Sequence, residues 1–257
     1  MYLCSVIQKS HAAIVMKVLH ILPNQRTADI LCRAGVPKEN IYAFPVLLAE
    51  SDRSLWKHFI PNDIKQYDRI IVWHGNDANS LLIYALFCML DVPLWHIDAY
   101  AHQTHLYNRY VIGKRKTTQI NMAMMTDIGV RVLYGKEQKV RWWQVLWNKR
   151  RWKKALLFPN ELIQRDRKGL CYFGKDKIET LCLSHITQDY QPMTSVLAKI
   201  MTHLELYHEY VSEGYLVQCL RKLETEGKLE IRPTTGAKIK FGSLTDVNYE
   251  IKRTTIK

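Results

Sequence analysis

Short apolar runs alternate with helix-length amphipathic segments through the first hundred residues of the chain. The clearest run is Ile70, Ile71, Val72 and Trp73, a continuous apolar stretch typical of a strand that is buried on both faces of a sheet. We predict strands at residues 17–22, 40–46, 69–74 and 94–97, and helices between them at residues 27–34, 51–59 and 76–90. This alternation indicates right-handed βαβ units, and therefore an α/β domain with a mostly parallel open sheet and flanking helices.

The last ninety residues follow a different order. Helices are predicted at 175–186, 193–204 and 213–226, and short strands at 228–232, 238–241 and 247–253. Three helices before a small β ribbon is the order of a winged-helix-like α+β module. The third helix carries three glutamates against one arginine and one lysine, which makes it a poor reader of the DNA major groove. We therefore expect this module to serve packing or homodimerisation rather than sequence-specific DNA recognition.

The chain has 257 residues, which is long enough for more than one core. We predict an α/β domain over residues 1–106, with residues 1–15 as a candidate extension outside its core. Residues 107–170 are predicted to be a basic, tryptophan-rich helical connector, and residues 171–257 the winged-helix-like module. Within the connector, residues 136–158 contain neither glycine nor proline, so we expect a helix there.

The positive charge is concentrated in the middle of the chain. Residues 101–170 carry sixteen Lys and Arg against four Asp and Glu, whereas residues 1–100 balance at nine of each. Four of the seven tryptophans lie in the same basic stretch. Because such a field attracts polyanions, we expect nucleic acid or another polyanion as the partner.

The helical wheel of the basic stretch leaves its role open. Trp142 and Trp152 fall on one face with other apolar residues, while Gln144, Asn148 and Arg151 lie on the most polar face. In one interpretation the tryptophans are core and the long basic side chains extend over them to water. In the other, the stretch lies across a phosphate backbone and some aromatic rings stack on bases. A helix on anionic lipid is disfavoured, because globular-looking sequence flanks the stretch on both sides.

The second interpretation names the residues that would contact nucleic acid. They are Lys114, Arg115, Lys116, Arg141, Lys149, Arg150, Arg151, Lys153 and Lys154.

A group of polar residues follows the predicted strands. Ligands of open parallel sheets bind beyond the carboxyl ends of the strands, where His74, Asn76, Asp77 and Asp98 are expected to lie. A free helix N-terminus beside a titratable imidazole favours an anionic ligand. The alternative is structural: Asn76 or Asp77 caps the helix, Gly75 makes the turn, and His74 is a satisfied turn residue.

Several classes of protein are disfavoured. Neither GxGxxG nor GxxxxGK[ST] occurs, and the sequence predicts no cofactor. His96, Asp98, His102 and His105 lie close together but lack the spacing of a known metal motif, so we predict no metal. The longest apolar-rich stretch, residues 81–90, is too short to span a membrane. The six cysteines are scattered, which indicates reduced thiols in a cytoplasmic protein.

Several short segments resemble an uncharacterised bacterial family. They are residues 17–22, 51–56, 70–77 and 220–229, together with the region of Trp143, Leu146 and Asn148. The family is catalogued as domain of unknown function 1835 followed by domain of unknown function 3658. The resemblance implies the two-domain order and a polar cleft around Arg53, His74, Asn76 and Asp77, and no reaction. The chain departs from it at residues 23–25, where Pro-Asn-Gln replaces a glycine-rich turn.

We therefore expect a non-enzymatic protein that binds nucleic acid through its basic middle. The alternative is a transferase or hydrolase that acts on an anionic substrate at the carboxyl end of the sheet. In that case Arg53 would hold the anion, and His74 or Asp77 would be the general base. A scaffold that pairs through the C-terminal module is a third hypothesis.

Overall fold

The N-terminal part of the protein is built on a five-stranded sheet of order β2-β1-β3-β4-β7. The computed structural model describes residues 16–102, 110–111, 118–119, 125–166, 169–207, 211–234 and 249–254. The strands are β1 (Val18–Leu22), β2 (Ile41–Ala43), β3 (Arg69–His74), β4 (Leu94–Asp98) and β7 (Gln138–Lys139). The first four are parallel, and β7 pairs antiparallel with β4. The predicted α/β class and mostly parallel sheet are confirmed, whereas β7 lies in a stretch that was predicted to be helical.

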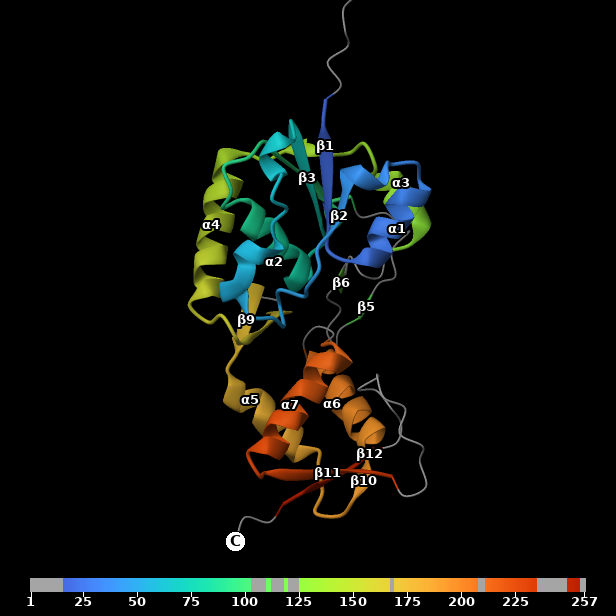
Figure 1. Ribbon diagram of the computed structural model, residues 1–257, viewed down its shortest axis with the longest axis vertical. Helices are drawn as coiled ribbons and strands as arrows, with labels where there is room; N and C mark the ends of the chain where they lie inside the picture. The colour runs from blue at the N-terminus through green and yellow to red at the C-terminus, as the bar shows by residue number, and fades with distance from the viewer. Residues whose placement is uncertain are drawn as a thin grey trace, which may run out of the picture.

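Helices cover both faces of this sheet (Figure 1). One face packs against α1 (Gln25–Arg33) and α3 (Asp127–Leu133), and the other against α2 (Ala78–Phe87) and α4 (Trp142–Leu156). Alternate residues of β3 therefore point into different cores: Ile70 and Val72 lie with α2, and Ile71 and Trp73 lie on the opposite side. The 3₁₀-helices are η1 (Lys38–Asn40), η2 (Arg53–Phe59) and η3 (Ile64–Gln66).

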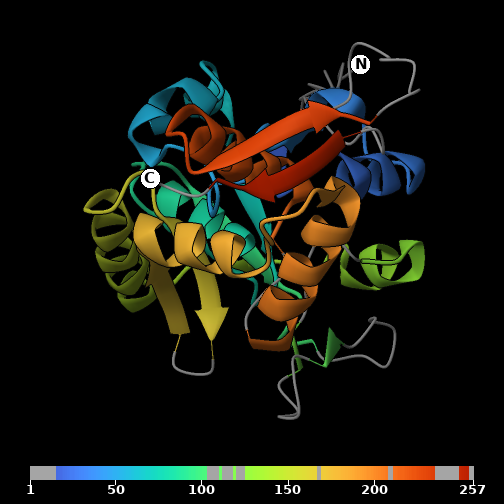
Figure 2. The same cartoon turned by 90° about the horizontal axis from the view of Figure 1, so that it is seen from below.

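The C-terminal lobe has its own core beneath this sheet (Figure 1). Its elements, in chain order, are α5 (Lys175–Ser184), β10 (Gln191–Pro192), α6 (Met193–Tyr207), α7 (Glu213–Thr225), β11 (Leu229–Pro233) and β12 (Tyr249–Arg253). The three strands form an antiparallel sheet of order β10-β12-β11, and Figure 2 shows β11 and β12 lying across the helices. The predicted helices and two of the predicted strands are found here, and β10 is an addition. The predicted strand at 238–241 lies outside the described residues.

Two hairpins complete the description. The first is β5 (Tyr110–Val111) with β6 (Thr118–Gln119), and the second is β8 (Leu162–Asp166) with β9 (Gly169–Phe173). Trp152 and Ala155 of α4 and Ile163 of β8 are buried in the same core as α2. The segment predicted as a connector thus supplies side chains to the core of the sheet. The division of the chain at residues 106 and 170 stays a prediction. The candidate extension, residues 1–15, lies outside the described residues.

No helix in the described part of the chain combines the length and the apolar content needed to cross a membrane.

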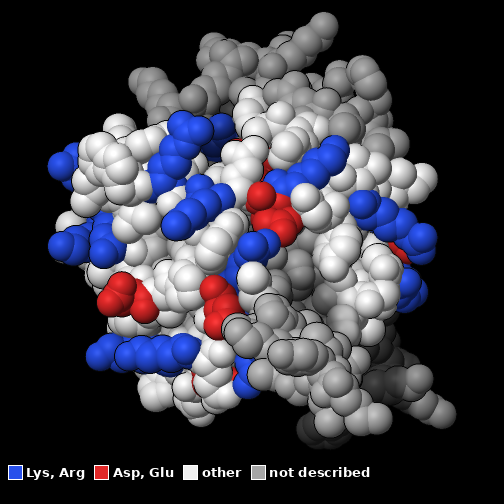
Figure 3. Space-filling view, turned by 90° about the horizontal axis from the view of Figure 1, so that it is seen from above, with Lys and Arg blue, Asp and Glu red and all other residues white. Residues whose placement is uncertain are grey.

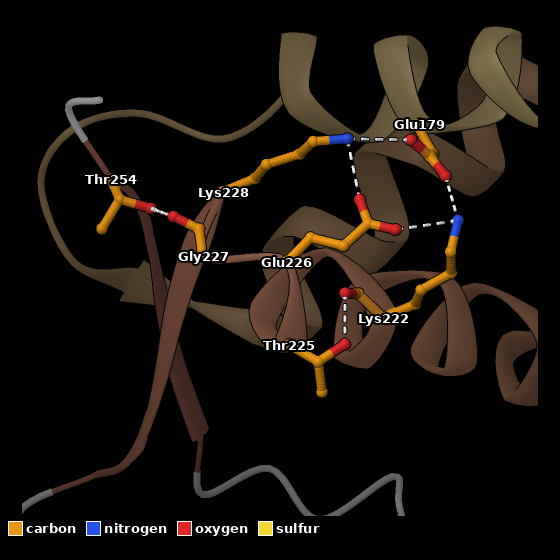
Figure 4. A network of polar contacts seen from close by, with 7 residues as sticks. All are labelled: Glu179, Lys222, Thr225, Glu226, Gly227, Lys228 and Thr254. Carbon is orange, nitrogen blue, oxygen red and sulfur yellow. Dashed lines mark hydrogen bonds and ion pairs between the residues drawn. The ribbon is translucent and has the colours of Figure 1, made fainter. Parts of the chain in front are cut away.

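A ring of ion pairs links the elements at one end of the C-terminal lobe (Figure 4). Lys222 of α7 pairs with Glu179 of α5 and with Glu226, and Lys228 pairs with the same two carboxylates at 3.2 and 2.8 Å. Close by, Thr254 Oγ1 donates a hydrogen bond of 2.6 Å to the carbonyl oxygen of Gly227. These contacts join α5, α7 and the ends of β11 and β12. They also use both positive charges of this region within the lobe.

The two lobes meet at Glu50. Its carboxylate accepts hydrogen bonds from the backbone N–H of Ser212, at 2.7 Å, and from the Ser212 hydroxyl. Ser212 is the N-cap residue of α7, so the carboxylate lies at the positive end of that helix. Burial nevertheless raises the pKa of Glu50 above its ordinary value, because removal from water penalises the charged form more than the Ser212 bonds favour it.

Replacing this carboxylate should change the pH dependence of stability. Because the pKa of Glu50 is higher in the folded state, that state binds more protons, and Glu50 lowers stability as pH rises through the ordinary value of 4.5. We expect Glu50→Gln to be more stable relative to the wild type at pH 7 than at pH 4, because only the wild type loses stability as Glu50 ionises. Urea unfolding at both pH values measures this difference. Glu39→Gln, on exposed η1, is the matched control, and an equal pH dependence in both variants would contradict the assignment.

Candidate functional site

The outer face of α4 is aromatic. Of its four tryptophans only Trp152 is buried, while Trp142, Trp143 and Trp147 are 75%, 45% and 67% exposed. Leu146 is exposed between them. The interpretation that the tryptophans of this helix are core residues is therefore wrong for three of the four.

The inner face of α4 carries buried polar groups beside its apolar packing. Asn148 is buried, and its Nδ2 donates a hydrogen bond of 2.9 Å to the carbonyl oxygen of Gln144. Its Oδ1 accepts one of 2.6 Å from Arg151 Nη1, and both Gln144 and Arg151 are half-buried. The face that looks most polar on the helical wheel is thus turned towards the protein. Buried side chains of α2, β3 and β4 that carry polar groups, namely Tyr84, His74 and His96, lie on that side of the helix.

Two histidines form the centre of these groups. His74 Nε2 lies 3.0 Å from His96 Nδ1, and His74 Nδ1 lies 3.0 Å from the carbonyl oxygen of Gly75. Since a carbonyl only accepts, His74 Nδ1 carries the proton, and Nε2 accepts from His96 Nδ1. Gln144 Oε1 accepts from the backbone N–H of Arg141 at 2.8 Å, so its amide nitrogen is free to donate to His96 Nε2 at 3.4 Å. The hydrogen bonds then run in one direction, from Gln144 through His96 to His74.

This arrangement requires both imidazoles to be neutral. Burial lowers the pKa of His96 to about 4 and also lowers the pKa of His74. The Tyr84 ring stacks on both, at 4.4 Å from His74 and 5.2 Å from His96, and burial raises the pKa of its hydroxyl. That hydroxyl has no hydrogen-bond partner among the described residues. Burial also raises the pKa of the nearby Cys88 thiol to about 12, so it is no nucleophile at neutral pH.

The residues predicted at the carboxyl end of the sheet do come together. His74 and Asp98 are paired positions on β3 and β4, and buried Asn76 and Asp77 follow directly on β3. Asp77 caps α2, with Oδ1 2.9 Å from the Ser80 backbone nitrogen and Oδ2 2.6 Å from its hydroxyl. Asp98 Oδ1 accepts from two backbone N–H groups of the following turn. These contacts are the ones that the structural interpretation of the segment expects.

Arg53 lies elsewhere and offers no donor to a ligand. It is fully buried, and its guanidinium makes five hydrogen bonds, one for each N–H, all to carbonyl oxygens. The acceptors belong to Leu48, Ser51, Ala155, Phe158 and Glu161. Burial lowers its pKa to about 10, which leaves it charged at neutral pH. Arg53 therefore fastens the end of α4 to the segment that leads into η2.

Sequence reasoning missed three members of the buried group. Tyr84 lies within an apolar run, and Gln144 is an ordinary helix residue, so neither carries a signal. His96 was considered only as a metal ligand, although it is separated from Asp98 by one strand residue. Only the pairing of β3 with β4 brings it beside His74.

The expected cations divide into three sets. Lys114, Arg115 and Lys116 lie outside the described residues. Arg151 donates into the buried group, as described above. The rest belong to α4 or its N-cap, and none of them forms an ion pair with a carboxylate that the structure describes: Arg141, Lys149, Arg150, Lys153 and Lys154.

Two of the four carboxylates in residues 101–170 form ion pairs with cations outside α4. Asp127 pairs with Arg33 at 3.2 Å and Glu137 with Arg69 at 3.0 Å, and both cations come from the first hundred residues. Figure 3 shows Lys and Arg side chains spread over one face of the molecule and interrupted by small acidic patches. The positive charge is thus distributed over that face, and on α4 it is not neutralised by the described carboxylates.

Comparisons with models of protein families, with curated proteins and with solved structures found no match to this chain. The resemblance to the uncharacterised bacterial family stays a prediction.

Replacing Arg53 should cost stability even when the charge is kept. Lysine has three donors on a single nitrogen, so Arg53→Lys loses at least two of the five hydrogen bonds at a buried position. We expect the free energy of unfolding to fall by about 2–4 kcal/mol, measured by urea titration. Arg26→Lys on exposed α1 is the matched control, and we expect it to change stability by less than about 0.5 kcal/mol. An equally small effect at Arg53 would refute its role as a fastener.

The histidine pair should make the fold sensitive to acid. With a folded pKa of about 4 against 6.5 when unfolded, His96 takes up its proton mainly in the unfolded state, so stability falls as pH drops between these values. The loss from this group approaches about 2–3 kcal/mol at pH 4. His96→Gln, which keeps a donor and an acceptor, should lose less stability between pH 7 and pH 4.5 than the wild type. His58→Gln, on exposed η2, should retain the full loss.

Proposed function

We propose that the protein binds nucleic acid through the outer face of α4. This α4 surface comprises Trp142, Trp143, Leu146, Trp147, Lys149, Arg150, Lys153 and Lys154. The observation that carries the proposal is the absence, among the described residues, of any carboxylate paired with these four cations. Cations that lie within two turns of one helix repel one another, and a phosphate backbone removes that repulsion.

The C-terminal lobe offers a contrast within the same chain. There Arg221 pairs with Glu224, Arg232 with Glu250, and Lys252 with Glu230, in addition to the ring around Lys222 and Lys228. The described cations of this lobe are therefore largely satisfied internally. The cations of α4 thus differ from most of those in the C-terminal lobe, although Lys38, Lys65 and Lys199 also form no ion pair with a described carboxylate.

The order of elements in the C-terminal lobe supports a winged-helix-like module. A helix, a short strand, two further helices and two strands follow one another, and the first strand joins the ribbon at its edge. Both cations of α7 are engaged by glutamates, which favours packing over reading of a DNA groove. A homodimer through this module stays a prediction.

The enzymatic alternative receives less support from the contacts. Arg53 has no donor left for an anion, and Asp77 acts as a helix cap. Both nitrogens of His74 are engaged in hydrogen bonds. Catalysis at the carboxyl end of the sheet therefore stays a prediction without a substrate.

The salt dependence of binding tests the proposal. We expect Arg150→Gln, Lys153→Gln and Lys154→Gln together to weaken binding of a labelled 20-nucleotide DNA at least tenfold at 100 mM salt. The slope of log K against log salt should lose about two to three units, because each lost phosphate contact removes about 0.7–0.9 of a unit. Fluorescence anisotropy between 50 and 200 mM salt measures both quantities.

The matched control removes the same charge elsewhere. Lys38, Lys65 and Lys199 are exposed on η1, η3 and α6, and changing all three to Gln should leave the slope within one unit of the wild type. If both triple variants lose affinity equally, binding follows net charge and the α4 surface is not the site.

A further inference from the structure

The α4 surface carries more apolar area than binding of phosphates requires. Trp142 and Trp147 are among the most exposed large apolar side chains of the described residues, and Trp143 and Leu146 lie beside them. Tryptophan is highly buried on average in folded proteins, and a contiguous apolar patch on a surface marks a place where something binds. A bare polyanion gives these rings nothing to contact.

Aromatic and cationic side chains occupy successive halves of the same helical face. Trp142, Trp143 and Trp147 lie in its first two turns, and the four exposed or half-exposed cations lie in its last two. Residues four apart share a side of the helix, so Trp143 and Trp147 form one row, which continues through Arg150 to Lys154. Rings and charges therefore lie along one path across the surface.

We infer that the ligand is single-stranded nucleic acid, whose unpaired bases stack on Trp142, Trp143 and Trp147 while its phosphates lie along the cations. This inference rests on the proposed binding of nucleic acid. Aromatic rings that stack on bases, beside a groove or row of cations, are the usual means of binding single strands without sequence preference. In a duplex the base faces are already stacked, and exposing them costs unstacking energy.

The length of α4 sets the size of the site. Fifteen helical residues span about 22 Å, which is the length over which a strand can contact this face. The surface is also limited by its anchoring. The inner face of the helix is joined to the histidine group and to Trp56, whose ring lies 6.4 Å from that of Trp152. The bases would therefore stack on tryptophan rings whose positions are set by a helix anchored to the rest of the protein.

The experiment compares probes that differ in one property at a time. Labelled dT20 and U20 are single strands, dT20 annealed to dA20 is a duplex, inorganic polyphosphate lacks bases, and phosphatidylserine vesicles present an anionic lipid surface. Binding is followed by anisotropy, by competition, and by quenching of tryptophan fluorescence at equal salt. We expect both single strands to bind at least tenfold more tightly than the duplex or polyphosphate and to quench the fluorescence.

Variants separate stacking from charge. Trp142→Leu with Trp147→Leu keeps apolar bulk but removes the rings, and should weaken single-strand binding about 10- to 100-fold with an unchanged salt slope. Trp142→Phe with Trp147→Phe should restore most of the affinity, because phenylalanine also stacks. Leu157→Ala changes an equally exposed apolar side chain at the C-cap and should have no effect. All these positions are exposed, and urea unfolding confirms that each variant is folded.

The outcomes distinguish base stacking on the tryptophans from the proposed binding of nucleic acid by charge alone. If duplex and polyphosphate bind as tightly as the single strands and the Leu variant binds like the wild type, stacking is refuted while charge-driven binding remains. Tighter binding to the vesicles than to any oligonucleotide overturns the inference in favour of a lipid surface. If no oligonucleotide shows salt-dependent binding, the proposed function itself fails.

Discussion

The guanidinium of Arg53 is the contact on which the exposed helix depends. It is fully buried and donates to carbonyls on both sides of a long sequence separation, from Leu48 to Glu161. A buried cation is costly unless its donors are all used, and here each N–H has an acceptor. The carbonyl oxygens at the end of α4 and in the turn that follows lose hydrogen bonds to water on folding. The guanidinium of Arg53 donates hydrogen bonds to them in place of that water. This bond network anchors the end of α4 and the turn that follows it to the segment before η2.

The inner face of α4 is held by a second polar group. Gln144 bonds to His96, and Asn148 and Arg151 are linked to Gln144 within the helix, beside the apolar packing of Trp152 and Ala155. The Gln144–His96 bond and the packing of Trp152 and Ala155 lie on the inner side of the helix, and the tryptophans of the opposite side are left in water. Trp152 alone turns inward, against Trp56. The aromatic surface thus lies opposite an inner face that is partly polar and partly apolar, and a ligand of the proposed kind would supply the apolar contact that the fold does not.

Much of the architecture could be predicted because local patterns carry it. Alternation of apolar runs and helical segments predicts the parallel strands and most of the helices, whereas the expectation that α7 is a poor groove reader stays a prediction. The site was harder, since its residues come from α2, β3, β4 and α4. His96 and Tyr84 look unremarkable along the chain, and only strand pairing and helix packing place their rings in one stack.

Arg53 shows the limit most clearly. A lone arginine in a polar segment is compatible with anion binding, and nothing nearby reveals that distant carbonyls will take every donor. The helical wheel of α4 failed for a related reason, because it assumes that the apolar side of a helix faces the core. By itself the sequence determined the class of fold, the position of the charge and the presence of tryptophans beside it. The tertiary structure alone decided which face of α4 meets water, since that choice depends on buried hydrogen bonds between residues that are far apart in the chain.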